Sequence, residues 1–156
     1  MPNWGYSITG LNPEKTVKAS GRELRVSPKA AREVCNAVKG MKLEEARNFL
    51  EQVIQKKKAV PYRRSKKKIG HRRGLQKAYS GRYPVKAAQK ILDVIEQAEA
   101  NAEYRGFDTE GLRVIHAAAY PGRKIRKYIP RAFGRTSSYF ETLCHVEVVL
   151  EQAEGT

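Results

Sequence analysis

The sequence predicts an α+β fold, a small globular domain of three helices and a β-sheet with a long protruding β-hairpin. Apolar residues recur at helical spacing in three segments, at about 28–40, 42–57 and 84–105. Two strand-like runs follow, on either side of a stretch rich in Gly and Pro. A length of 156 residues is typical of one domain. We therefore expect a single domain over 1–156, with a body at 15–121, a basic insert at 56–83 and a hairpin at 112–150 whose distal part is about 120–139.

The first part of the chain predicts an arm, a strand and a helix. Residues 1–14 contain Pro, Gly and Asn and are expected to form a terminal arm. In 15–26, apolar and basic residues alternate on either side of Ser20-Gly21, which predicts one strand broken by a bulge or a short hairpin. Ser27-Pro28 marks a helix start, because Ser can cap the free amides and Pro has no N–H to leave unpaired. Gly40 is placed to end this helix. Its apolar face consists of Ala31, Val34, Cys35 and Val38.

Two further helices enclose a basic segment. The apolar face of the helix at 42–57 is Leu43, Ala46, Leu50, Val53 and Ile54. Between 56 and 82 the chain has twelve Lys or Arg, no carboxylate and no periodicity, which predicts a long loop with at most a short helical turn. Pro84 begins the third helix, which runs to about Arg105. Its apolar stripe is Val85, Ala88, Ile91, Leu92, Ile95, Ala98 and Ala102, and its carboxylates predict that the other side faces solvent or protein.

The last part of the chain predicts one long hairpin. "LRVIHAAAY" begins at 112, and "YFETLCHVEVVL", from 139, alternates clearly. We expect Phe140, Cys144, Val146, Val148 and Leu150 on the core side, and Glu141, His145 and Glu147 on the other. A turn near Ala132 would place residue 114 opposite about 150 and residue 120 opposite about 144.

The charge predicts a polyanionic partner. The formal net charge is +15 and the pI is about 10.0, an excess that destabilises a compact state through self-repulsion. Nucleic acid is favoured over a membrane surface, because no strongly apolar helix carries cations along one side. No run approaches ~18 apolar residues and the start does not resemble a signal peptide, so we expect no membrane span. We also expect no self-association.

The distal hairpin needs support from outside the protein. Each arm would have about 18 residues and span on the order of 60 Å, whereas a domain of this size is about 30 to 35 Å across. A two-stranded ribbon alone is at best marginally stable. Between Tyr120 and Tyr139 the chain carries six cations and no acid. Phosphates would neutralise those cations, and the interleaved Ile125, Tyr128, Ile129, Phe133 and Tyr139 would pack against bases or sugars.

No pattern in the sequence predicts catalysis, a cofactor or a metal. His145 adjoins Cys144, but neighbouring strand residues point to opposite faces. His116 lies on a predicted strand, and His71 lies among cations that oppose its protonation, which favours a contact with RNA. Cys35 and Cys144 are far apart in sequence, which is typical of two buried thiols. We therefore expect a protein that is not an enzyme.

In its order of elements the chain closely resembles the family of large-subunit ribosomal protein twenty-two, the universal family numbered seventeen in eukaryotes. The stretches that carry the resemblance are "LRVSPKAAREVCNAVKG", "LEEARNFLEQVI", "KAAQKILDVIEQAEANAE" and "KYIPRAFGRT", which span residues 24–136 in the family's order. The basic insert resembles that of the archaeal and eukaryotic branch.

The resemblance implies a structural protein of the cytoplasmic large ribosomal subunit that binds and stabilises rRNA and touches neighbouring ribosomal proteins. The distal hairpin would penetrate the rRNA. Its tip would line the nascent-peptide exit tunnel, where it would meet the nascent polypeptide, through Ile129, Pro130, Arg131, Ala132, Phe133, Gly134 and Arg135. The candidate rRNA-binding residues are Lys18, Arg22, Arg25, Lys29, Arg32, Lys56, Lys57, Lys58, Arg63, Arg64, Lys66, Lys67, Lys68, His71, Arg72, Arg73, Lys77, Arg82, Arg123, Lys124, Arg126, Lys127, Arg131 and Arg135.

Two other classes of protein remain as alternatives. An architectural DNA-binding protein uses long β-arms with a Pro near the tip as a minor-groove wedge, which Ile129-Pro130 would fit. Such proteins usually pair their arms in dimers, whereas a second basic segment and an acidic helix face suit an RNA pocket with several sides. An RNA-modifying enzyme would need a cofactor loop or a catalytic constellation, which the sequence does not show.

Overall fold

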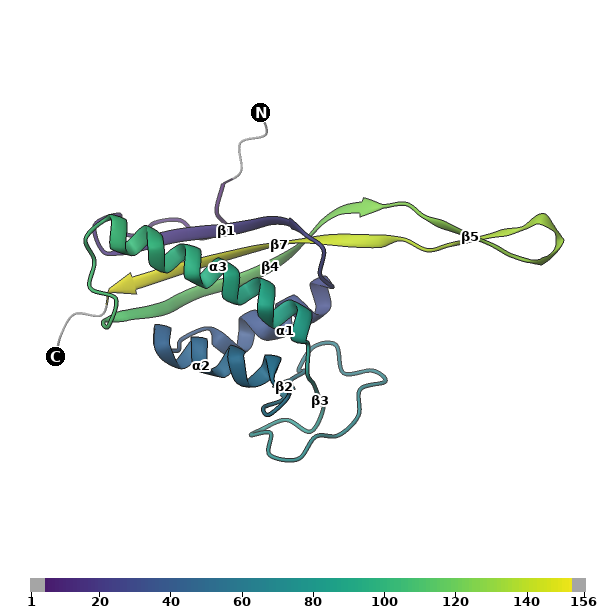
Figure 1. Cartoon of the computed structure of the whole chain (residues 1–156), viewed down its shortest axis with the longest axis horizontal. Coiled ribbons are helices and arrows are strands. Elements are labelled where there is room, and N and C mark those ends of the chain that lie inside the picture. The colour runs from purple at the N-terminus through teal and green to yellow at the C-terminus, as the bar shows by residue number, and fades with distance from the viewer. Residues whose placement is uncertain (1–4, 153–156) are drawn as a thin grey trace.

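The computed structural model describes residues 5–152, which form a sheet covered on one face by helices, with a long ribbon projecting from one end (Figure 1). The α+β prediction is confirmed. The elements in chain order are β1 (Thr16–Leu24), α1 (Pro28–Val38), α2 (Leu43–Ile54), β2 (Val60–Pro61), β3 (Gly81–Arg82), α3 (Val85–Tyr104), β4 (Leu112–Ile125), β5 (Tyr128–Pro130), a 3₁₀ turn η1 (Ala132–Gly134), β6 (Thr136–Ser138) and β7 (Glu141–Gln152).

The main sheet has three antiparallel strands in the order β1-β7-β4, so the last strand of the chain lies at its centre. Val17 and Val114 both lie opposite Leu150, as expected for the hairpin at 114. Of the two predictions for 15–26, the bulged strand is correct, since the register of β1 shifts between Gly21 and Leu24. The bulge lets β1 bend over the helices at the point where the chain turns into α1.

The first two helices begin close to the predicted residues. α1 begins at Pro28, and Gly40, whose φ of +87° favours glycine, follows its end. Ser27 occupies the N-cap position, but its side chain makes no hydrogen bond to the helix, so the predicted capping interaction is wrong. α2 ends at Ile54, three residues before the predicted end, and the chain then enters the basic insert.

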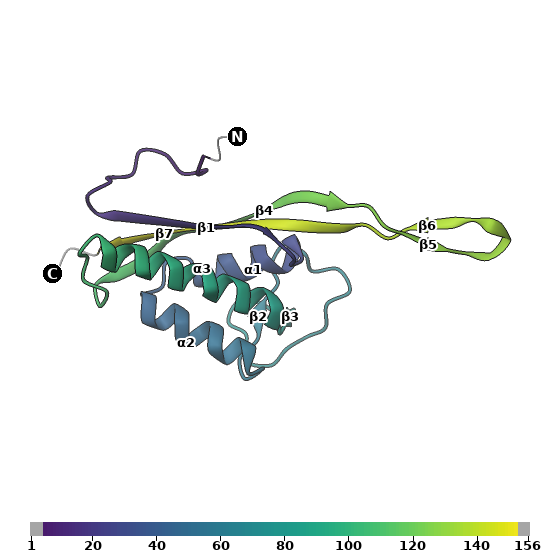
Figure 2. The same cartoon turned by 45° about the horizontal axis from the view of Figure 1, so that its top comes forward.

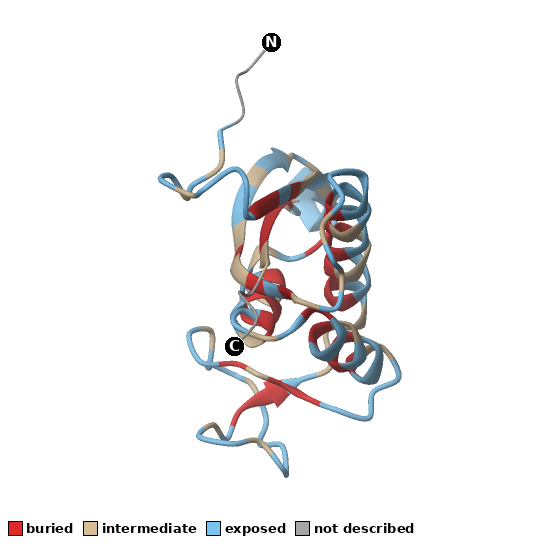
Figure 3. Cartoon of the chain, turned by 90° about the vertical axis from the view of Figure 1, so that its left-hand side faces the viewer, coloured by how far each residue is buried: buried red, intermediate tan, exposed pale blue. Residues whose placement is uncertain are grey.

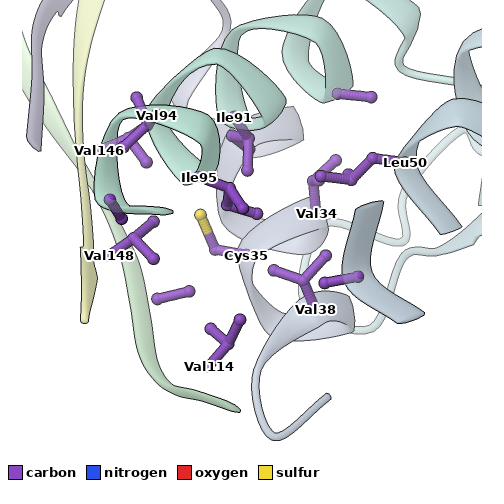
Figure 4. Packing of buried hydrophobic residues seen from close by; sticks show 14 of the residues in the cluster. Val34, Cys35, Val38, Leu50, Ile91, Val94, Ile95, Val114, Val146 and Val148 are labelled. Carbon is purple, nitrogen blue, oxygen red and sulfur yellow. The ribbon is translucent and has the colours of Figure 1, made fainter. Parts of the chain in front are cut away.

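The core lies where α3 crosses between the sheet and the other two helices (Figure 4). In Figure 4, Ile95 lies among residues of α1, α2 and the sheet, and Val94 lies beside Val146 of β7. Val94 was absent from the predicted stripe, although it is 2% exposed. The helix packs against two surfaces, the sheet and the pair α1–α2, and therefore buries a wider arc than a one-sided amphipathic helix.

The central strand is buried on both faces, which the alternation did not predict (Figure 3). His145 and Glu147 were expected on the open side, yet they are 8% and 3% exposed. The arm crosses that side, where the backbone N of Ser7 donates to both carboxylate oxygens of Glu147 at 3.2 Å. His116 and Tyr120 also contact Glu147 Oε1, at 3.1 and 3.0 Å. Burial raises the pKa of Glu147, but these hydrogen bonds outweigh it and leave the pKa below its ordinary value.

Replacing Gly21 by Ala is expected to destabilise the body by about 1–3 kcal/mol, because a Cβ at this bulge overpacks the core. That atom would lie 2.8 Å from Cγ2 of Val94 and 2.9 Å from Cδ1 of Leu24. Urea unfolding of both proteins measures the loss. The matched control is Gly70→Ala in the insert, where an added Cβ meets nothing within 4 Å. Equal stability of the Gly21 variant and the parent protein would contradict the close packing of β1 on α3.

Candidate nucleic-acid interface

The ribbon extends from the main sheet without a helix beneath it (Figures 1 and 2). β4 pairs with β7 as far as Ile125 opposite Glu141, and after a short break β5 pairs with β6. We call residues 126–140 the distal ribbon. Tyr120 lies opposite His145, one residue from the expected partner, because the register of β4 shifts between Val114 and His116; a second shift follows Pro121. Such shifts increase the local twist and turn the ribbon away from the sheet.

The turn near Ala132 is confirmed. The backbone N of Arg131 donates to the carbonyl of Arg135 at 2.7 Å, which closes the tip. Phe133 has a φ of +58° and is 94% exposed. A bulky residue in this left-handed conformation is uncommon, so the tip holds its aromatic ring outward at a cost in backbone strain. All seven predicted tip residues, 129–135, are exposed.

Apolar side chains of the distal ribbon lie in solvent. Tyr128, Ile129 and Tyr139 are 59%, 43% and 61% exposed, and Ile125 is half-buried. Phe140 was expected on the core side, but it is 48% exposed and its ring meets that of Tyr128 edge-on at 5.8 Å. The alternation of β7 continues past the last helix that could cover it, so Phe140 belongs to the ribbon. Exposed aromatics of this density are typical of a surface that packs on another molecule.

Glu141 links the root of the ribbon to the body. Its carboxylate accepts from Arg25 Nε at 2.6 Å and from Lys127 Nζ at 2.9 Å. Hydrogen bonds from Arg25 and then Lys127 lower the pKa of Glu141 to about 2, and the same contact raises the pKa of Arg25. These two candidate rRNA-binding cations are therefore engaged by one carboxylate, which orders the point where the ribbon leaves the sheet.

Replacing Glu141 by Gln is expected to lower the melting temperature slightly at pH 6, by less as the pH falls, and by very little near pH 2. The pKa of Glu141 is depressed in the folded state, so its contribution is present above the unfolded value of about 4.3 and is lost as the pH falls toward about 2. Melting curves of both proteins across that range give the difference. Glu96→Gln, at an exposed site on α3, serves as the control. A gap that stays constant down to pH 2 would contradict the ion pairs.

The basic insert, residues 56–83, is an irregular loop held at three places. β2 pairs with β3 at its base, and His71 forms a single bridge with Ser80. The third anchor is Glu33 of α1, which is 1% exposed and accepts from the backbone N of Arg63, Arg64 and Ser65 at 3.1, 2.9 and 3.2 Å. Because the carboxylate takes the amides, both arginine side chains remain exposed. The predicted long loop without a regular helix is confirmed.

The two basic segments project from the same end of the body, the end at which α1 and α3 begin (Figures 1 and 2). Every candidate rRNA-binding residue is exposed except Arg22 and Lys127, which are half-buried. Some cations rest on aromatic rings, with Lys18 Nζ 5.5 Å from the centroid of Tyr6 and Lys66 Nζ 5.9 Å from that of Tyr79. Lys18 lies apart, beside Asn101 near the end of α3, whereas the two basic segments offer an extended cationic surface around the end at which α1 and α3 begin.

Two residues of this surface were missing from the sequence prediction. Lys86, at the start of α3, lines a groove at the root of the ribbon together with Arg25 and Lys29. Its position at the start of a helix, directly after the insert, was the only feature of the sequence that could have indicated a place in this surface. Glu33 was not singled out because an acidic residue on a helix is usually solvated.

The described residues contain neither a membrane-spanning helix nor a cluster of metal ligands, and their two thiols are buried. Within 5–152, no helix has the length and apolar character needed to cross a membrane. Over the same range no three His, Cys, Asp or Glu side chains gather as a metal site would require. Both thiols are free and buried as predicted, and burial raises the pKa of Cys35 to about 12 and that of Cys144 to about 11. Thiols with such pKa values are not nucleophiles at neutral pH.

Comparison with known proteins gives consistent matches over nearly the whole chain. The family described as "Ribosomal protein L22p/L17e" matches residues 19–151. A protein from Methanopyrus kandleri, named large ribosomal subunit protein uL22, is 52% identical over 153 residues, 96% of each chain. Proteins of the same name from Archaeoglobus fulgidus and Methanocaldococcus jannaschii are each 49% identical, over 97% and 91% of both chains. These relatives are archaeal, in agreement with the resemblance of the insert to the archaeal and eukaryotic branch.

Proposed function

Because the chain belongs to the ribosomal protein L22p/L17e family, we propose that it binds and stabilises the rRNA of the large subunit as a structural protein. A member of this family is a component of the large subunit of the cytoplasmic ribosome and is not an enzyme. The observation that carries the proposal is the distal ribbon, whose aromatic rings and whose cations other than Lys127 are exposed and have no body beneath them. Both kinds of side chain have natural partners in folded RNA.

The cations supply the affinity. Phosphate contacts give nucleic-acid binding most of its strength, and each one adds about 0.7 to 0.9 to the slope of log K against log salt. The basic insert and the distal ribbon together surround one end of the body, so one RNA fold can contact both. The insert neutralises phosphates at the surface of the RNA, while the ribbon passes between RNA segments. This arrangement joins RNA regions that are distant in sequence.

The tip of the ribbon lines the nascent-peptide exit tunnel in this proposal. Phe133 and the neighbouring Gly134 both have positive φ, and the turn keeps the aromatic ring fully outward. Arg131 and Arg135 close the turn through their backbones. Arg131 Nε also donates to Ser137 Oγ at 3.3 Å, and both guanidinium groups are exposed to phosphates. The tip thus presents an apolar ring, to a peptide or a base, between two cations.

The remaining partners follow from the other face of the molecule. Most acidic side chains of α2 and α3 are exposed, and neighbouring large-subunit proteins rather than RNA are expected to sit against them. The DNA-binding alternative rested on the β-arm alone, and membership in a ribosomal family removes its basis.

Centrifugation of a native lysate through sucrose gradients tests the proposal. At low and at moderate salt the protein is expected to migrate with the large subunits, and nuclease treatment of the RNA is expected to release it. Free protein, or protein bound to DNA in the same gradients, would contradict the proposal. Cross-linking of the tip to a stalled nascent chain tests the tunnel position separately.

A further inference from the structure

A hollow of about 690 Å³ lies between α1, α2 and the basic insert. Its size is within the range of small-molecule sites, about 300–1,000 Å³. Its apolar lining comes from Ala37, Met41, Phe49 and Tyr83. Its polar lining includes the cations Lys57, Lys58 and Arg73. Phe49 also belongs to the buried core, and Ala37 and Met41 pack against it, so the hollow lies at the outer edge of that core.

The insert wall of the hollow is fixed in place. The Glu33 carboxylate also lines the hollow, and it accepts the three backbone amides of Arg63, Arg64 and Ser65. The three N–H donors partly neutralise the negative charge of Glu33, so this carboxylate does not prevent an anionic ligand from binding in the hollow. Because α1 and the insert are joined here, the hollow is present before any ligand arrives.

The cations lie next to the aromatic lining. Lys58 Nζ is 5.0 Å from the centroid of the Phe49 ring, and the guanidinium carbon of Arg72 is 5.6 Å from that of Tyr83. Phe49 is 7% exposed and Tyr83 is half-buried, so Tyr83 offers a ligand the larger aromatic surface, next to positive charge. A nucleotide has this combination, since its base is a flat ring and its phosphate is an anion.

We propose that this hollow binds a single unstacked nucleotide from a single-stranded segment of RNA. The inference rests on the proposed function and adds to it a second RNA-binding site, which lies away from the ribbon and binds one nucleotide. The base stacks on the aromatic lining, and the phosphate on either side meets Lys57, Lys58 or Arg73. A base inside a duplex is paired and stacked on its neighbours, so double-stranded RNA cannot place one in the hollow.

Replacing Ala37 by Phe fills the hollow without removing a cation. The full-length variant and the parent protein are titrated with a fluorescent nine-residue oligouridylate and with an RNA duplex of equal length. The single strand is expected to bind roughly five- to 150-fold more weakly, the loss that removal of one stacked base gives. Duplex affinity and the salt slope of the single strand are expected to stay unchanged, because no phosphate contact is lost.

The matched control is Ala100→Phe on the exposed side of α3, which is expected to change neither affinity. Equal single-strand affinity of the Ala37 variant and the parent would overturn the inference. If the parent protein bound neither RNA, the proposed function would fail together with the site. If it bound both and the variant bound both equally, only the site would fail.

A second measurement requires no variant and therefore holds even if Ala37→Phe does not fold. The parent protein is irradiated with an oligonucleotide that carries 4-thiouridine, and the cross-linked peptides are identified by mass spectrometry. Cross-links at Phe49, Met41 or Tyr83 are expected. Cross-links confined to the distal ribbon would overturn the inference, as would a peptide of a neighbouring protein found in the hollow in native subunits.

Discussion

Replacing five cations of the basic insert by Gln is expected to weaken RNA binding about a thousandfold near 0.15 M salt. The five residues are Arg63, Arg64, Lys66, Lys67 and Lys68, all exposed. If each meets one phosphate, the slope of log K against log salt should fall by about 3.5 to 4.5. Titrations of a large-subunit rRNA fragment at several KCl concentrations give both the affinity and the slope. Folding should persist, because Glu33 is held by backbone amides that the substitutions keep.

The control for this experiment is the triple variant of Lys39, Lys42 and Lys90, which are exposed cations outside the candidate interface. Its slope is expected to stay within about one unit of the parent value. A slope that falls equally per charge in both variants would show that RNA responds to net charge alone. That result would contradict a defined interface at the insert.

Deleting residues 128–138 is expected to remove stable incorporation into large subunits and to leave the free protein's melting temperature within a few degrees of the parent. The backbone N of Tyr139 donates to the carbonyl of Lys127 at 2.7 Å, so an Asn-Gly turn can join these two residues without moving the root. The deleted residues form strand pairs with one another, β5 with β6, and most of them are exposed; Tyr128 also contacts the ring of Phe140. They therefore contribute little to the stability of the body.

For the deletion variant, calorimetry measures the melting temperature, and sucrose gradients of cells that express only the shortened chain measure incorporation. Loss of the two charges of Arg131 and Arg135 alone should weaken rRNA binding roughly tenfold and lower the slope of log K against log salt by about 1.4 to 1.8. A double variant, Arg131→Gln with Arg135→Gln, separates the charge from the shape of the ribbon. A shortened chain that melts far below the parent would contradict a ribbon that is independent of the body.

Local sequence signals predicted the elements whose stability is local. Pro28 marked the start of α1, the spacing of Leu50 and Val53 marked α2, and the pairing of Val114 with Leu150 followed from a turn near Ala132. The candidate interface could be predicted in the same way, because the runs of Lys and Arg in the insert and the ribbon can be read from the sequence without knowledge of the fold. The resemblance to a ribosomal family was confirmed by the comparisons.

The errors arose where distant segments meet. The polar side of β7 was expected to face water, but Ser7 of the arm covers Glu147, and no pattern within β7 encodes that contact. The burial of Glu33 likewise depends on amides thirty or more residues later in the chain. Phe140 continued the alternation of β7 and was wrongly expected to face the core. Periodicity describes one element, whereas burial depends on what the rest of the chain brings to it.

The central position of β7 has a consequence for synthesis. β1 and β4 each pair with β7 and not with each other, and β7 follows both of them in the chain. The sheet therefore cannot close until β7 has left the ribosome, because both of its long-range pairings need that strand. Until then both cationic segments are tethered to an unfolded chain that attracts any nearby polyanion. The chain therefore needs protection from other polyanions until β7 is in place, and deletion of β7 should prevent folding of the sheet altogether.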